Sequence, residues 1–227
     1  MAVFPDARKI QDYQSLCNAV ADELNRQDML NSIPIFTQLA TKRIERDLTR
    51  AKHQYMIKRA ATVFFDLYTT LPCSYIAAHQ LMETDTSVLV DYIGPNESKE
   101  WLSGRYPIPN RTNIKSGIAY YTIIGDQLRI FPYDEQGYKS ALNPHLDFWF
   151  YSQLDELNNQ NPTNWALERY PDLFFYGTLA HSAPYLKADE RLATWDGIYS
   201  RLMADIETEA ERGVRSGTRL NAARKSF

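Results

Sequence analysis

Cysteine is scarce in this sequence, with two residues among 227, Cys17 and Cys73, which lie far apart. Neither forms a CxxC pair, so the sequence indicates neither a disulfide framework nor a zinc site. The histidines fall in four separate predicted elements and are His53, His79, His145 and His181. None shows the two-ligand helix spacing of a metalloenzyme, so we expect no metal and no other cofactor.

Glycine is also scarce, at nine residues. The phosphate-binding patterns GxGxxG and GxxxxGK followed by Ser or Thr are absent, and so is the GxSxG turn that presents a nucleophilic serine. The dense cluster Asp189-Glu190-Arg191 is typical of a first helical turn, where acids complement the helix dipole. We therefore expect no catalytic residues and no enzyme activity, and an enzyme that processes a small molecule is the least favoured alternative.

Long apolar runs are missing, since none reaches the roughly 20 residues that span a bilayer. The N-terminus lacks a basic segment followed by an apolar run, so no signal peptide is predicted. The net charge is −3, which does not suit a chain that binds nucleic acid over its whole surface. We expect no membrane contact.

Helical periodicity is present at both ends of the chain. Apolar residues spaced three and four apart predict a helix over residues 5–26. A second helix should begin at Ser32, whose hydroxyl can cap it, with Pro34 in the first turn. Its inward side chains should be Phe36, Leu39, Ala40 and Ile44.

Further helices are expected towards the C-terminus. Thr163 can cap a first segment, which Pro171 should break or restart, and Pro184 should kink the next segment or begin its end. Asp189 should cap a last long helix. The apolar stripe of that helix keeps three-four spacing and comprises Leu192, Trp195, Tyr199, Leu202 and Ile206.

The middle of the chain is rich in β-branched and aromatic residues, which predict strands. The expected strands are 62–68, 87–93 and 145–151, with a short helix over 96–102. The strongest signal is a hairpin, because residues 119–124 and 127–131 flank the pair Gly125-Asp126. Glycine in the first position suits a type II′ two-residue turn.

This order of elements predicts an α+β fold, in which N- and C-terminal helices form a bundle and a small antiparallel β-sheet domain is inserted between them. The expected parts are N-terminal helices over 1–56, the β domain over 57–157, C-terminal helices over 158–211 and a flexible basic tail over 212–227.

The tail has five basic residues and no acid, and four acids precede it between positions 205 and 211. Such a segment is expected to order on binding an acidic surface. The predicted contact residues for such a surface are Arg212, Arg215, Arg219, Arg224, Lys225 and Phe227.

Aromatic residues make up 13% of the chain and include fifteen tyrosines. Tyrosine is enriched at protein interfaces, where one side must be apolar and the other wet. We expect contacts between subunits at Tyr120, Tyr133 and Tyr138. Stacking on bases or sugars and ordinary packing within the sheet are the alternatives.

Two helical segments resemble a family of tailed-bacteriophage head-to-tail adaptor (connector) proteins. The first reads IPIFTQLA at 33–40 followed by RIERDL at 43–48. The second reads NWAL at 164–167, YPDLFFYGTL at 170–179 and APYLKADER at 183–191, and continues to Trp195 and Tyr199. The resemblance spans roughly residues 30–205.

This resemblance implies a structural virion protein of the neck, assembled in the host cytoplasm as a homo-oligomeric ring, commonly a dodecamer. Its partners would be the portal protein and the tail or nozzle proteins, and the ring would help to close the DNA-filled head. A head-completion or tail-completion protein in another ring is the alternative within the same class. The residues of the basic tail would bind the portal protein or a neighbouring subunit, and contact with channel DNA without sequence specificity is the alternative.

Overall fold

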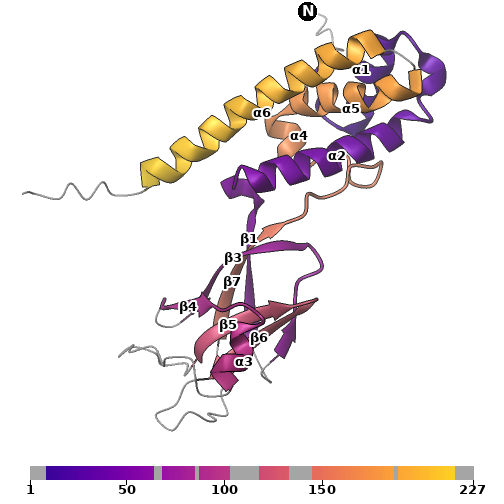
Figure 1. The fold of residues 1–227 in the computed structure, drawn as a ribbon. Helices are drawn as coiled ribbons and strands as arrows, with labels where there is room; N and C mark the ends of the chain where they lie inside the picture. Colours follow the sequence, from indigo (N-terminus) through magenta and orange to yellow (C-terminus); the bar gives the residue numbers. More distant parts are fainter. Residues whose placement is uncertain are drawn as a thin grey trace, which may run out of the picture. The chain divides into compact units, whose positions relative to one another are not determined.

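The chain folds into two compact units, Met1–Met56 with Leu154–Phe227, and Ile57–Gln153. The first unit is helical and the second contains a sheet (Figure 1). The computed structural model describes residues 9–63, 68–84, 87–102, 118–132, 145–186 and 189–217. The predicted α+β class is confirmed.

The helical unit is organised around α5, which packs against α1, α2, α4 and α6. Two short 3₁₀ segments, η1 (Gln27–Met29) and η2 (Gln54–Met56), follow α1 and α2. The α-helices are α1 (Tyr13–Leu24), α2 (Ile33–Arg50), α4 (Trp165–Arg169), α5 (Pro171–Leu186) and α6 (Asp189–Gly217).

The helix starts differ from the predicted caps. α1 begins at Tyr13, because Asp12 and Ser15 form a capping box there. The predicted helix over residues 5–26 was wrong for residues 9–12, which are not helical. Ser32 precedes α2 but makes no side-chain capping bond. Its backbone is already helical, with φ of −98° and ψ of −26°, whereas a capping side chain needs extended backbone. The cap of α4 is Asn164, which accepts from the Leu167 N–H at 2.8 Å, and not Thr163.

Proline sets the boundaries around α5 as predicted, because α4 ends at Arg169 and α5 restarts at Pro171. Pro184 lies inside the last turn of α5. α6 runs to Gly217 and thus continues six residues past the expected end at residue 211. Glu211 and Arg215 stand four residues apart, and basic residues near a helix C-terminus complement the dipole, so the helix is favoured through this segment.

The β unit contains a seven-stranded sheet in the order β1-β7-β3-β4-β5-β6-β2. The strands are β1 (Ile57–Val63), β2 (Tyr68–Thr70), β3 (Tyr75–Glu83), β4 (Leu89–Tyr92), β5 (Ile118–Ile124), β6 (Gln127–Pro132) and β7 (His145–Ser152), and α3 is Glu97–Leu102. The β5–β6 hairpin is confirmed. Its turn has φ of +62° at Gly125 and no positive φ at Asp126, as a type II′ turn requires.

Three features of the sheet were predicted wrongly. β4 and β5 pair in parallel, so the sheet is not purely antiparallel. The connection between them holds more than twenty residues including α3, which is long enough for a parallel crossover. β1 begins at Ile57 and not at residue 62, and β3 was not expected at all although it pairs with both β7 and β4.

The β unit has its own apolar core. Three alternate residues of β7, Leu146, Phe148 and Phe150, are at most 3% exposed and point into it. They meet residues of β3 to β6 and the segment after β2, namely Leu71, Leu81, Val90, Ile118, Tyr121, Leu128 and Ile130. A strand with a period of two directs these side chains to one face of the sheet.

Candidate interface on the helical unit

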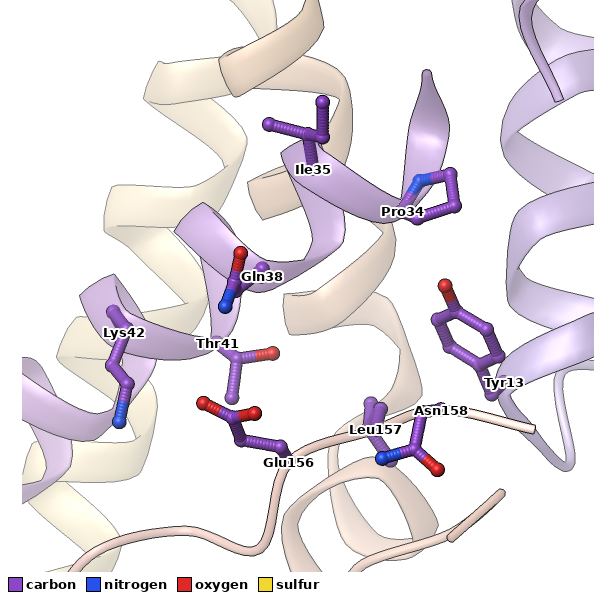
Figure 2. A pocket seen from close by; sticks show the side chains of 9 residues that line it. All are labelled: Tyr13, Pro34, Ile35, Gln38, Thr41, Lys42, Glu156, Leu157 and Asn158. Atoms are coloured by element: carbon purple, nitrogen blue, oxygen red, sulfur yellow. The ribbon is translucent and has the colours of Figure 1, made fainter. Parts of the chain in front are cut away.

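A groove of about 260 Å³ lies beside α2 in the helical unit. Figure 2 shows its walls, with α2 on one side, residues 156–158 facing it and Tyr13 of α1 at one end. Its lining is Tyr13, Pro34, Ile35, Gln38, Thr41, Lys42, Glu156, Leu157 and Asn158. The lining contains no histidine or cysteine and no serine, so it offers no nucleophile with an imidazole base beside it.

Metal ligands do not converge in the part of the chain that the structure describes, where no group of three or more His, Cys, Asp or Glu residues could hold an ion. No helix among the same residues is long and apolar enough to cross a membrane. The polar groups of the helical unit instead connect its helices to one another.

One of these polar networks centres on Tyr170, at the junction of α4 and α5. His53 Nε2 lies 3.1 Å from the Tyr170 hydroxyl, which donates to Glu209 Oε2 of α6 at 3.1 Å. Arg169 donates to Tyr170 at 3.1 Å and to Glu209 at 2.7 Å. The Tyr55 N–H lies 3.4 Å from His53 Nδ1, which therefore acts as the acceptor and leaves the proton on Nε2.

His53 is buried at 2% exposure and stacks on Trp165, with ring centroids 5.4 Å apart. Burial lowers the pKa of His53, and the nearby Arg169 charge lowers it further while Glu209 opposes this. The hydrogen bond from Arg169 lowers the pKa of Glu209. The network is therefore arranged for a neutral imidazole and an ionised carboxylate.

Acid should destabilise the helical unit through this network. An unfolded histidine has a pKa near 6.5 and takes up its proton before the folded His53 does, so the stabilisation is complete above about pH 6.5 and is lost as the pH falls through the lower folded pKa. Thermal unfolding followed between pH 7.5 and 5 should show a falling melting temperature. His53→Gln should flatten this slope, with His79→Gln at an exposed position as the matched control. A slope unchanged by His53→Gln would contradict the assignment.

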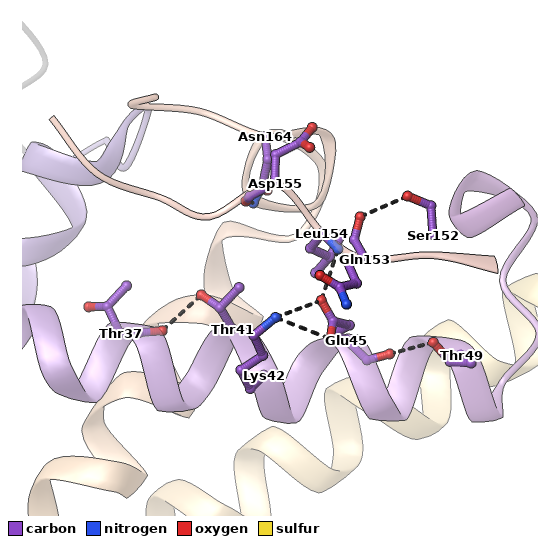
Figure 3. Close-up of polar contacts among 10 residues, drawn as sticks. All are labelled: Thr37, Thr41, Lys42, Glu45, Thr49, Ser152, Gln153, Leu154, Asp155 and Asn164. Carbon is purple, nitrogen blue, oxygen red and sulfur yellow. Dashed lines mark hydrogen bonds and ion pairs between the residues drawn. The ribbon is translucent and has the colours of Figure 1, made fainter. Parts of the chain in front are cut away.

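Glu45 anchors the segment that re-enters the helical unit after the β unit. Its side chain is only 7% exposed, and its carboxylate accepts the backbone N–H of Leu154 at 2.9 Å and faces Lys42 Nζ at 3.4 Å (Figure 3). A buried N–H without a partner is costly, so this carboxylate stabilises the path of the chain at Leu154. Residues 154–157 accordingly belong to the helical unit.

The solvent-facing side of α2, which we call the exposed line, comprises positions 35, 39, 42, 46 and 50. It is more apolar than the sequence predicted. Phe36, Ala40 and Ile44 are buried as expected, but Leu39 is 48% exposed and Ile35 is 59% exposed. A spacing of three and four residues shows that a helix has an apolar side, but not how far the buried part extends around the helix. In this structure α5 covers the side of α2 that carries Ala40. Tyr185 of α5 is 64% exposed and lies 5.7 Å from the Phe36 ring. Exposed apolar side chains that lie close together are typical of a protein interaction surface.

The structure describes only some of the interface residues that were predicted from the sequence. Tyr120 of β5 is only 8% exposed, which leaves it little surface for a neighbour, and Arg212 is exposed on α6. Position 215 lies within α6. The other predicted residues lie outside the described part of the chain and are Tyr133, Tyr138, Arg219, Arg224, Lys225 and Phe227.

A family model described as SU10 adaptor protein matches residues 11–222, nearly the whole chain. The chain belongs to this family. The prediction of a phage head-to-tail adaptor family is confirmed, and the protein is a structural adaptor of the phage particle that interacts with other virion proteins. A comparison with curated proteins found no match to the chain.

The candidate functional sites of an adaptor are the surfaces that bind other virion proteins. Leu39 was predicted to face the core, and the exposure of Ile35 was not predicted. Ile35 and Leu39 stand four residues apart, so they are neighbours on the surface of α2 beside its buried side. This spacing is the sequence feature that could have predicted an exposed apolar pair.

Proposed function

We propose that this adaptor is a non-enzymatic protein whose ring joins the portal to the tail and helps to close the DNA-filled head. The observation that carries the proposal is the family match over residues 11–222. In this proposal the helical unit is a bundle with the β unit inserted between its N- and C-terminal helices. A heterologous contact repeated around an axis closes such subunits into a ring. In this proposal the ring is a dodecamer.

Electron microscopy of the purified adaptor, with and without its portal protein, tests this role. We expect a ring of adaptor subunits on the portal and no comparable binding to a tail protein alone. A chain that stays monomeric and ignores the portal would refute the role. A ring that binds only the nozzle or another tail protein would favour the second candidate, a head-completion or tail-completion protein.

The basic C-terminal segment is proposed to bind an acidic surface of the portal or of the neighbouring subunit. Deleting the residues after Gly213 removes Arg215, Arg219, Arg224 and Lys225 and should weaken portal binding at least tenfold, with a flatter dependence on salt. Affinity is measured by titration at several salt concentrations.

The matched control for this deletion replaces the arginines by lysine at positions 215, 219 and 224, which keeps the charge. The control should bind nearly as well as the unaltered chain. Equal affinity and equal salt dependence of the deleted and full-length chains would show that the segment does not contact the portal. Competition by short duplex DNA would indicate the alternative, contact with channel DNA.

A further inference from the structure

The hydroxyl of Tyr170 uses every hydrogen-bonding position that it has. It donates its one hydrogen to Glu209 Oε2 at 3.1 Å, because an ionised carboxylate can only accept. Arg169 Nε, which can only donate, lies 3.1 Å from the same oxygen and occupies one of its two lone pairs. The remaining lone pair faces His53 Nε2 at 3.1 Å. His53 must therefore donate from Nε2, since Tyr170 has no second hydrogen to give.

The other ring nitrogen of His53 is then left as an acceptor. A neutral imidazole carries one hydrogen, so Nδ1 has only its lone pair. The backbone N–H of Tyr55 donates to this atom at 3.4 Å. Tyr55 belongs to η2, the short segment Gln54–Met56, which also packs against α6. The neutral form of His53 thus joins η2 on one side, through Tyr170, to Glu209 of α6 on the other.

A second proton on His53 has one place to bind, and that place already faces a donor. The proton must go to Nδ1, where the new N–H would point at the N–H of Tyr55 with no acceptor between them. Water does not relieve this conflict in the folded chain, because His53 is only 2% exposed. The ring of Trp165 does not relieve it either, because Trp165 stacks on the face of the imidazole and the conflict lies in the imidazole plane.

The charges that act on His53 oppose each other. Burial lowers the pKa of His53 most, Glu209 of α6 raises it and Arg169 of α4 lowers it. The other titratable groups in contact, Tyr55 and Tyr170, are tyrosines and carry no charge between pH 5 and 8. Glu209 is bound to Arg169 at 2.7 Å, so it cannot approach Nδ1 without leaving that partner. The one carboxylate that could stabilise a protonated His53 is therefore already in use.

The side chain of Tyr55 connects η2 to the ion pair on α6. It is 48% exposed, and its hydroxyl accepts from Arg169 Nη1 at 3.2 Å. The guanidinium carbon of Arg169 also lies 4.8 Å from the centre of the Tyr55 ring. A movement of η2 away from His53 therefore displaces Arg169 and weakens its bond to Glu209.

We propose that protonation of His53 opens a latch between η2 and the second half of α6. The latch consists of His53, Tyr55, Arg169, Tyr170 and Glu209, and it is closed while His53 is neutral. When the ring takes up a second proton, the Tyr55 N–H leaves Nδ1, η2 separates from the imidazole, and Glu209 loses its attachment to the junction of α4 and α5. The latch is a property of the single chain and does not depend on the proposed function.

The first test reads the position of the hydrogen on His53. Long-range proton–nitrogen NMR spectra of the full chain distinguish the two neutral tautomers, and His53→Gln identifies the His53 signal by removing it. At pH 7.5 we expect the hydrogen on Nε2. A hydrogen on Nδ1 at this pH would overturn the proposal, because Tyr55 would then not be held by a lone pair that protonation removes.

Hydrogen exchange of the full chain tests the opening itself. Between pH 7.5 and 5, after correction for the intrinsic exchange rate, protection of residues 54–56 and 205–212 should fall at least tenfold. Protection of α1 should change less than twofold. His53→Gln cannot take up the proton, so protection of the same segments should not depend on pH, whatever its level. Unchanged protection in the unaltered chain, or an equal loss in α1, would refute a local latch.

Arg169→Gln provides a test that leaves His53 in place. Removing this positive charge raises the pKa of His53, so the loss of protection should begin at a higher pH than in the unaltered chain. Arg169 is half exposed, and its replacement should leave the chain folded. Arg201→Gln, at an exposed position of α6, is the matched control and should not move the onset. An onset that stays in place or moves to lower pH in Arg169→Gln would contradict the latch.

Discussion

Replacing Tyr199 with alanine should lower the free energy of unfolding of the helical unit by about 3–5 kcal/mol, the range for truncating a large buried aromatic side chain. Tyr199 is 1% exposed, and its hydroxyl donates to Asp47 at 2.7 Å. The Arg43 guanidinium lies over its ring at 3.9 Å. Burial raises the pKa of Tyr199, so the hydroxyl remains a donor over the usual pH range.

The stability lost in Tyr199→Ala has a contribution from the hydroxyl and a contribution from the packing of the ring. Tyr199→Phe separates the two. This variant keeps the ring, the cation contact and the volume, but leaves Asp47 without one donor, so it should cost about 1–3 kcal/mol. Denaturant unfolding followed by circular dichroism measures both variants. If Tyr199→Ala lowered the free energy of unfolding no more than Tyr199→Phe, the ring of Tyr199 would not contribute to the core packing that the structure shows.

Phe148→Ala should have an effect of similar size, about 3–5 kcal/mol, in the β unit. Phe148 is 2% exposed on β7, with its ring centroid 5.4 Å from Phe150 and 5.9 Å from Tyr75. The residues of this core cluster all lie within the β unit. We therefore expect the loss to be concentrated in the β unit.

Amide hydrogen exchange locates this effect. Protection should fall in β3 and β7, and much less in α2 and α5. Ile124→Ala, at a position on β5 that is 49% exposed, is the matched control and should change stability by less than about 0.5 kcal/mol. Equal loss of protection in both units would show that they unfold together.

Local signals predicted the parts of the fold that depend on local chemistry. Gly125 alone can take the positive φ of a II′ turn without strain, so the hairpin around it was predictable. Pro171 cannot continue the helix before it, and the restart of the helix there was predictable for the same reason. β3 was not predictable, because its sequence YIAAHQLME is rich in helix-forming residues and becomes a strand only between β7 and β4.

The candidate interface shows the same division. That Ile35 and Leu39 stand four residues apart can be read from the sequence. Whether Leu39 faces the core or the solvent depends on where α5 covers α2, and that contact requires Gly177 opposite Ala40.

The sequence by itself determined that this chain is an α+β protein, and its two helical segments were sufficient to indicate the phage adaptor family, because turn residues, periodicity and local motifs act over a few neighbours. Only the tertiary structure decided which faces stay exposed and that β4 and β5 pair in parallel. These features depend on contacts between residues far apart in the chain, and the free energy of such contacts comes from packing that no short segment contains.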